Sequence, residues 1–251
     1  MRNYSFLLRN LVLKDFRIRY RNMSLGVFWS LLNPLIMMGV MTFVFTVLSP
    51  WRTPHFPAFV LCALVPFNFF SVSWATSTTS VVENQALIRR QRFPREILPV
   101  STVLANCLHF LIQIGLLFIF VLASGYGINR HWLWLPLVWG LEVVFACGMG
   151  LMTSALDVYF RDVRYVVESA NRILFFVVPI FYGFAIIPQR FHLIYQLNPI
   201  SAVVLATRNI LLEAKAPPWS LMWKLLAVSF FCLGLGAWVF DRLERKFADL
   251  V

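Results

Sequence analysis

The sequence predicts an all-helical membrane protein with six transmembrane helices, and three observations lead to that prediction. Of the 251 residues, 60% are hydrophobic and only 13% are charged, whereas soluble domains carry roughly a quarter charged residues. Six segments are apolar over about the 20 residues that a helix needs to cross a bilayer. The basic residues gather in alternate connections between these segments, as in multi-pass membrane proteins. The whole chain, 1–251, is expected to form a single transmembrane domain.

The six predicted spans differ in length and in polarity. The first two contain no charged residue, although the second half of the second span is rich in Ser and Thr. The fifth is short and contains Pro179 and Gly183. The spans are placed at Leu25–Ser49, Phe56–Val82, Pro99–Ser124, His131–Leu156, Ile173–Gln189 and Trp219–Phe240, within a membrane region of 25–240.

The distribution of Lys and Arg predicts that both termini lie in the cytoplasm. Of the 22 basic residues, 16 lie in the N-terminal stretch, the second and fourth connections and the tail of 241–251, and 6 lie on the other side. Connections rich in Lys and Arg stay in the cytoplasm. The two termini share a side only if the number of spans is even, and six satisfies this condition.

Two further segments are expected to touch the membrane without crossing it. Residues 1–22 place Tyr4, Leu7, Leu8, Leu11 and Ile18 at helical spacing among basic residues, which predicts a helix lying in the cytoplasmic interface. An ordinary solvated helix is the alternative.

The second such segment follows the fifth span. Asn198 is a suitable N-cap for a helix with Pro199 in its first turn. The stretch of 198–213 contains Arg208 and is too short to cross a bilayer. We expect a short external helix that re-enters the outer edge of the membrane, where protein or a water-filled cavity must shield its irregular ends.

The sequence contains none of the common motifs for nucleotide binding, metal binding or nucleophilic catalysis. No G-x-x-x-x-G-K-[ST] occurs, so the chain should not bind ATP phosphates itself. The four histidines are scattered, and no H-E-x-x-H or G-x-S-x-G occurs, so we expect no metal and no catalytic residue. The net charge of +11 is interpreted as topology signals and contacts with anionic lipid. No nucleic-acid partner is expected.

Three polar residues are predicted to lie inside the membrane. Glu142 falls near the middle of the fourth span, and Gln113 and His109 lie at similar depth in the third. A buried carboxylate without a partner costs several kcal/mol. We therefore expect Glu142 to pair with Gln113 or His109, with a structural role favoured over a proton-coupled one.

Aromatic residues inside the spans are candidates for the wall of a substrate path. Aromatic faces stack on the C–H faces of sugars, and such a wall lets a chain slide without tight binding. Contact with lipid or packing between helices is the alternative for each residue. The candidates are Trp29, Phe67, Phe70, Trp74, Phe181 and Tyr182.

Several short motifs are spread over the chain in a fixed order. The first is R-Y-R-N-M-S-L-G-V-F-W at 19–29, followed by N-P-L at 33–35. The second connection contains N-Q-A-L-I-R-R at 84–90 and F-P-R-E-I-L-P at 93–99. Y-F-R-D-V-R lies at 159–164, and N-P at 198–199 precedes Arg208. In register with the predicted spans, the set resembles the type-2 ABC permeases that export O-antigen, capsule and teichoic acid. The resemblance covers essentially the whole chain.

This resemblance implies an assembly and a substrate. The membrane subunits form a homodimer around one central path, and two copies of a separate ATPase subunit, with ATP and Mg, dock below. The substrate is a lipid-linked polysaccharide that crosses the bacterial inner membrane. The resemblance also implies that the external helix, with Asn198, Pro199 and Arg208, acts as a gate.

The same resemblance assigns two segments to the ATPase contact, Glu83–Glu96 and Asp157–Glu168. Arg161 and Asp162 are expected to pair locally or with the ATPase. The candidate coupling residues are Arg89, Arg90, Phe93, Arg95, Glu96, Arg161 and Asp162.

Two other functions remain open at this point. One is a drug or lipid exporter of the same superfamily, and the Phe93-Pro94-Arg95 sequence favours polysaccharide over it. The other is a stand-alone membrane enzyme or channel, which would work without an ATPase. The sequence names neither the glycan nor its lipid carrier.

Overall fold

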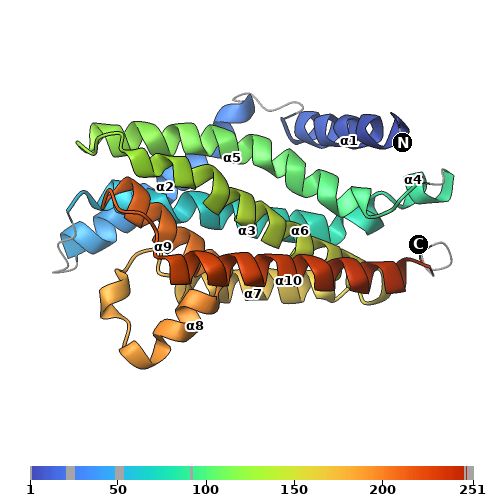
Figure 1. The fold of residues 1–251 in the computed structure, drawn as a ribbon. Helices are drawn as coiled ribbons and strands as arrows, with labels where there is room; N and C mark the ends of the chain where they lie inside the picture. The colour runs from blue at the N-terminus through green and yellow to red at the C-terminus, as the bar shows by residue number, and fades with distance from the viewer. Residues whose placement is uncertain (1, 21–25, 49–53, 91–92, 246, 248–251) are drawn as a thin grey trace.

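The computed structural model describes residues 2–20, 26–48, 54–90, 93–245 and 247, and over these residues the chain is helical with no strand. Figure 1 shows the long helices running side by side as a bundle, with the start of α1 and the end of α10 at the same end. The elements in chain order are α1 (Arg2–Tyr20), η1 (Gly26–Phe28), α2 (Trp29–Phe43), η2 (Val44–Leu48), α3 (Phe56–Glu83), α4 (Gln85–Arg90), α5 (Ile97–Ala123), η3 (Arg130–Trp134), α6 (Leu135–Tyr159), α7 (Val163–Val177), η4 (Phe184–Ile186), η5 (Gln189–Phe191), α8 (His192–Leu197), α9 (Pro199–Leu211) and α10 (Trp219–Glu244).

Five helical stretches of the described chain are long and apolar enough to cross a membrane. They correspond to the first, second, third, fourth and sixth predicted spans, so the prediction of an all-helical protein with several spanning helices is confirmed. Among them α3 is the most buried, because α5, α6 and α9 all pack against it. The stretches are Trp29–Val47, Phe56–Glu83, Ile97–Ala123, Arg130–Tyr159 and Trp219–Glu244.

The fifth predicted span, Ile173–Gln189, is not a continuous helix. The helix in this region is α7, which begins ten residues earlier, at Val163, and ends at Val177. Val178 is extended, with φ −66° and ψ 136°. Pro179 explains the break, because a proline disfavours helical backbone in the residue before it and offers no N–H to continue the helix.

The chain nevertheless crosses the bundle between α6 and α10. The Trp134 ring at the start of α6 meets the Trp219 ring at the start of α10, with centroids 5.5 Å apart. At the other end, Tyr159 Oη donates to the Leu243 carbonyl at 2.9 Å. Helices α6 and α10 therefore both run from the end of the bundle that holds Trp134 and Trp219 to the end that holds Tyr159 and Leu243. Because they run in the same direction, the chain must cross back between them. Helix α7, packed against α3 and α6, covers most of that return.

Helices α6 and α10 approach each other at two glycines. A Cβ on Gly148 would lie 2.6 Å from the backbone of Cys232 and Leu233, and a Cβ on Gly236 would collide with the Gly148 carbonyl. Small residues allow the backbones of membrane helices to approach this closely. The most extensive helix–helix contact of the bundle, between α6 and α10, therefore depends on these two positions.

The predicted amphipathic helix at the N-terminus is present as α1, and it packs alongside α5 (Figure 1). Thr102 Oγ1 donates to Asp15 Oδ2 at 3.4 Å, and the Phe16 ring stacks on His109 at 5.1 Å. Of the apolar residues of α1, Leu11 is buried, whereas Tyr4 and Ile18 are exposed. The sequence did not predict this pairing with α5, and placement of α1 in the cytoplasmic interface stays a prediction.

Candidate functional site

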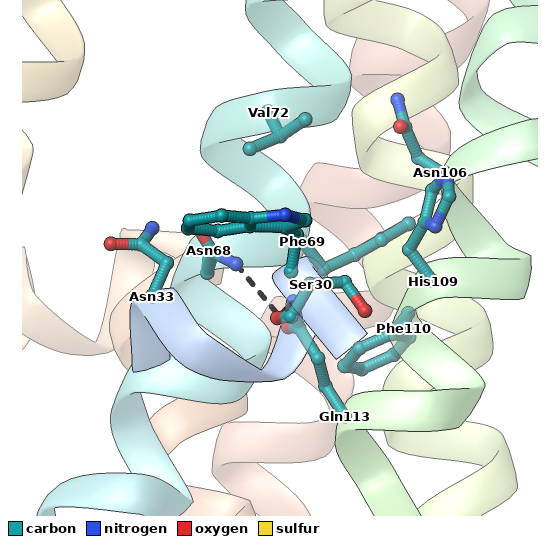
Figure 2. Close-up of a pocket in the computed structure, with 10 residues that line it drawn as sticks. Ser30, Asn33, Asn68, Phe69, Val72, Asn106, His109, Phe110 and Gln113 are labelled. Carbon is teal, nitrogen blue, oxygen red and sulfur yellow. Dashed lines mark hydrogen bonds between the residues drawn. The ribbon is translucent and has the colours of Figure 1, made fainter. Parts of the chain in front are cut away.

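A pocket of about 250 Å³, lined by polar and aromatic side chains, lies between α2, α3 and α5. Residues four apart on a helix share a face, so the sequence pattern brings three short polar and aromatic stripes together. Figure 2 shows Asn33 and Asn106 at opposite ends of the lining side chains, with Asn68 and Gln113 between them. The lining residues are Trp29, Ser30 and Asn33 from α2, Asn68, Phe69 and Val72 from α3, and Asn106, His109, Phe110 and Gln113 from α5.

Hydrogen bonds across this pocket join the three helices. Asn68 Nδ2 donates to Gln113 Oε1 at 3.3 Å (Figure 2), and Gln113 Nε2 donates to the Ser30 carbonyl at 3.0 Å. Asn106 Nδ2 donates to Thr76 Oγ1 at 3.0 Å. Thus Trp29, Gln113 and His109 of the predicted site residues meet here, together with Asn68 and Asn106, which sequence reasoning did not single out.

Glu142 does not take part in this network. Its side chain on α6 is 1% exposed, and neither carboxyl oxygen has a hydrogen-bond partner among the described residues. The hydrogen bond expected between Glu142 and Gln113 or His109 is therefore not formed. Gln113 bonds to α3 and α2 instead, because those helices, rather than α6, flank its face of α5.

We expect Glu142→Leu to raise the midpoint of thermal unfolding. The substitution removes a buried carboxyl group that has no partner, which costs about 1–3 kcal/mol. Unfolding of the purified chain in detergent measures the effect. Glu83→Leu at the exposed end of α3 is the control and should change the stability by less than about 0.5 kcal/mol. A lower midpoint for Glu142→Leu alone would show that the carboxyl has a stabilising partner.

Three of the predicted path aromatics are enclosed in the bundle. Phe67 is 7% exposed and meets Phe175 edge-on at 5.5 Å. Phe70 is 1% exposed and stacks on Phe145 at 5.3 Å, and Trp74, beside it, is 7% exposed. A ring enclosed by neighbouring helices does not contact a passing substrate. In this conformation these three rings are packing residues.

Phe181 and Tyr182 instead line an open aromatic pocket of about 550 Å³. Tyr182 Oη donates to the Val177 carbonyl at 2.7 Å, and lies 3.2 Å from Tyr195 Oη. The Tyr182 side chain thereby pairs one of the last carbonyls of α7. The other lining residues are Phe45, Ile186, Ile187, Pro188, Phe191 and Tyr195.

The predicted start of the short helix at 198–213 is confirmed. Asn198 Oδ1 accepts from the Ile200 N–H at 3.1 Å, and Pro199 occupies the first turn of α9. The cap satisfies one of the N–H groups that a helix leaves unpaired at its start.

Arg208 in α9 is buried and bonded to backbone carbonyls. Its Nη1 donates to Pro179 at 2.6 Å and to Tyr182 at 3.2 Å, and its Nη2 donates to Ile180 at 2.6 Å. Nε and Nη2 reach the Phe59 carbonyl at 3.3 and 3.2 Å, and the guanidinium lies 3.5 Å above the Phe59 ring.

These contacts explain how the break after α7 is tolerated. Beyond Val177 the carbonyls lack the N–H groups that a continuous helix would provide, and a buried carbonyl needs a donor. The planar guanidinium supplies several donors at once. Arg208 therefore fixes the segment 178–183 to both α9 and α3.

At the opposite end of the bundle, two predicted coupling segments bind the end of α10. The Arg95 guanidinium donates to the Glu244 carbonyl, and Tyr159 Oη donates to the Leu243 carbonyl at 2.9 Å. Both carbonyls belong to the last turn of α10, where a helix leaves its acceptors unpaired. Phe247, fully buried, packs against Tyr159 at 6.4 Å between ring centroids.

The other predicted coupling residues lie around this end. Arg89, Arg161 and Asp162 are exposed, and Phe93 is half-buried. Glu96 lines a cavity of about 280 Å³ with Asp241 and Glu244. The side chain of Arg90 lies outside the described part of the chain. Among the residues that the structure describes, no ion pair joins Arg161 to Asp162.

The ion pair that does form joins Asp157 at the end of α6 to Arg164 in α7. Arg164 Nη2 lies 3.0 Å from Asp157 Oδ2, and Arg164 Nε lies 3.3 Å from Oδ1. The Asp157 side chain is fully buried. The pair thus fixes the turn between α6 and α7, within the predicted segment Asp157–Glu168.

A double-mutant cycle on Asp157→Asn and Arg164→Gln should give a coupling energy of about 1–3 kcal/mol, because the contact is two-pronged and one partner is buried. The same cycle on the exposed pair Glu213–Lys215, at 3.4 Å, should give less than about 1 kcal/mol. Thermal unfolding measures both. Equal energies in the two cycles would contradict a structural role for the buried pair.

A family model described as ABC-2 type transporter matches residues 7–212. The chain belongs to the ABC-2 type transporter family. It is a permease subunit, and the several helices of spanning length fit a multi-pass membrane transporter.

Curated relatives cover nearly the whole chain. The O-antigen export system permease protein RfbA of Klebsiella pneumoniae is 28% identical over 95% of this chain and 92% of its own length. The protein of the same name from Myxococcus xanthus is 28% identical over 99% and 96%. The polysialic acid transport protein KpsM of Escherichia coli is 27% identical over 79% and 78%.

Proposed function

We propose that this ABC-2 permease is the membrane subunit of an ATP-driven exporter of lipid-linked polysaccharide, of the O-antigen or capsular type. The observation that carries the proposal is the similarity to O-antigen export permeases over almost the full length of both chains. A polymer on a lipid carrier is too polar to cross hydrocarbon alone. The permease must therefore supply a shielded path.

ATP is used by a separate subunit in this proposal. The sequence contains no phosphate-binding loop, so ATP and Mg bind to the partner, in two copies below a permease homodimer. The end of the bundle that holds α4 and the α6–α7 turn supports a docking role, because Arg95 and Tyr159 attach both segments to α10. A push on either segment would move α10 as a rigid body.

We assign this end to the cytoplasm and the chain to the bacterial inner membrane, with both termini cytoplasmic. The sixth crossing would be made by α7 and residues 178–183. Fifteen residues of helix span only about 22 Å, against roughly 30 Å of hydrocarbon. The extended residues that Arg208 holds would complete the distance.

The exposed face of α7 supports a water-filled path or a second copy beside it. Glu168, Ser169 and Arg172 are all exposed on this helix. Charged side chains inside a membrane avoid lipid and face a water-filled cavity or another protein surface. We place this exposed face of α7 at the central path of the homodimer. Trp29, Phe181 and Tyr182 would line the same path, and α9 would be its outer gate.

Deletion of the gene tests the function. Surface polysaccharide should disappear, lipid-linked polysaccharide should accumulate inside the cell, and the wild-type chain should restore export. Immunoblots of intact and lysed cells distinguish the two pools. Unaltered surface glycan together with lost drug resistance would instead identify a drug or lipid exporter of the superfamily.

A further inference from the structure

The pocket between α2, α3 and α5 (the α2–α3–α5 pocket, lined by the ten residues drawn in Figure 2) combines six polar side chains with aromatic and aliphatic ones, and most of its accessible surface is apolar. All three helices belong to stretches of membrane-spanning length. Hydrocarbon offers polar side chains no hydrogen-bond partner, so they need a partner in the protein or a polar occupant.

One buried acceptor in the pocket has no partner. Asn106 is 2% exposed, and its Nδ2 is used by the hydrogen bond to Thr76. Its Oδ1 bonds to nothing in the described structure. An unpaired buried acceptor costs about 1–3 kcal/mol. This oxygen is covered in the present conformation, so a hydroxyl group in the cavity would donate to it after the Asn106 side chain, which lines the pocket, has turned.

The chemistry of the lining restricts the occupant. Among the residues that the structure describes, no Lys, Arg, Asp or Glu lines the pocket, so a phosphate or carboxylate would find no counter-charge among them. Asn33, Asn68 and Gln113 carry amides, which both donate and accept, as hydroxyl groups do. A neutral group rich in hydroxyls therefore matches this lining.

The volume of the pocket and its aromatic rings further restrict the kind of ligand that fits. A cavity of 250 Å³ lies just below the roughly 300–1,000 Å³ of pockets for drug-sized ligands, so it has room for one ring and not for a chain of rings. Trp29, Phe69 and Phe110 add aromatic faces to the polar lining, and aromatic faces suit the C–H face of a sugar.

We propose that the α2–α3–α5 pocket binds one neutral, hydroxyl-rich ring, that is, a single sugar unit. The inference rests on the proposed function, because a polysaccharide exporter is the setting in which sugar rings meet these helices. The ring belongs either to the exported polysaccharide or to the head group of a glycolipid. The pocket is separate from the aromatic pocket of Phe181 and Tyr182.

The full-length chain in nanodiscs allows a direct binding test. The probes are the methyl α-glycosides of glucose, galactose, mannose and rhamnose, observed by saturation-transfer NMR. Asn106→Leu removes the free acceptor, and Val72→Phe fills the cavity without changing a polar side chain. Leu111→Phe, on the exposed face of α5 and outside the lining of both pockets, is the matched control. Thermal unfolding checks that each variant is folded. If Asn106→Leu does not fold, Val72→Phe alone decides the result.

We expect saturation transfer to at least one glycoside, weakened at least tenfold by Asn106→Leu and by Val72→Phe and unchanged by Leu111→Phe. Glucose 1-phosphate should give no signal. No transfer from the wild-type chain to any glycoside, or an equal signal in wild type and both pocket variants, would overturn the proposal. Competition by soluble O-polysaccharide fragments or by a monohexosyl glycolipid in the nanodisc identifies the source of the ring.

Export in cells separates this inference from the proposed function. If the wild-type chain restores surface polysaccharide but binds no glycoside, the sugar site is wrong and the exporter function stands. If the wild-type chain does not restore export, the proposed function itself fails.

Discussion

Replacement of Arg208 by methionine is expected to destabilise the protein by about 3–5 kcal/mol and to abolish export. The side chain donates to the carbonyls of Pro179, Ile180 and Tyr182 and to that of Phe59. Methionine has a similar length but no donor, so several buried carbonyls would lose their partner at roughly 1–3 kcal/mol each. Thermal unfolding in detergent and surface-polysaccharide immunoblots measure the two effects.

Two further variants make this test specific. Arg208→Lys keeps the charge but not the planar set of donors, so its stability should lie between those of wild type and Arg208→Met. Arg190→Met is the control, because Arg190 is exposed and lies 4.7 Å from the centre of the Phe191 ring. It should cost less than about 1 kcal/mol. Equal losses for Arg190→Met and Arg208→Met would contradict the assigned role of Arg208.

Of the substitutions that add a single methyl group to a glycine of the bundle, Gly236→Ala should lower the stability of the protein most. Its Cβ would collide with the Gly148 carbonyl, and neither backbone can retreat without separating α6 from α10. Forced overpacking of a close-packed contact costs about 1–3 kcal/mol or more. We expect a lower unfolding midpoint and less folded protein in the membrane fraction.

Gly234→Ala is the matched control two residues away on the same helix. No atom of the described chain lies within 4 Å of a Cβ at that position, so the variant should be as stable as wild type. If Gly236→Ala also leaves stability unchanged, the close approach of α6 and α10 is not formed in the protein.

The spanning helices can be predicted from the sequence because long apolar runs and the distribution of Lys and Arg are local signals. The start of α9 was equally predictable, since Asn198 and Pro199 are adjacent residues that form a cap. The fifth span was misplaced because hydropathy does not register the helix break. Pro179 is the local sequence signal of that break.

The contacts that sequence reasoning missed join residues far apart in the chain. Arg208 binds the carbonyl of Phe59, 149 residues away, and Asn106 binds Thr76 on another helix. No periodicity encodes such pairs. The exposure of the aromatic residues is equally hidden in the sequence. Phe70 and Trp29 are both aromatic residues within apolar segments, yet Phe70 is 1% exposed and Trp29 is 46% exposed.

Transport by purified components tests the central claim most directly. The permease and its ATPase would be reconstituted in liposomes with lipid-linked polysaccharide, and the glycan that reaches the opposite face would be detected with a lectin that cannot enter. We predict transfer that requires the permease, the ATPase and ATP together. Transfer without the ATPase, or no transfer by the complete set, would contradict the account.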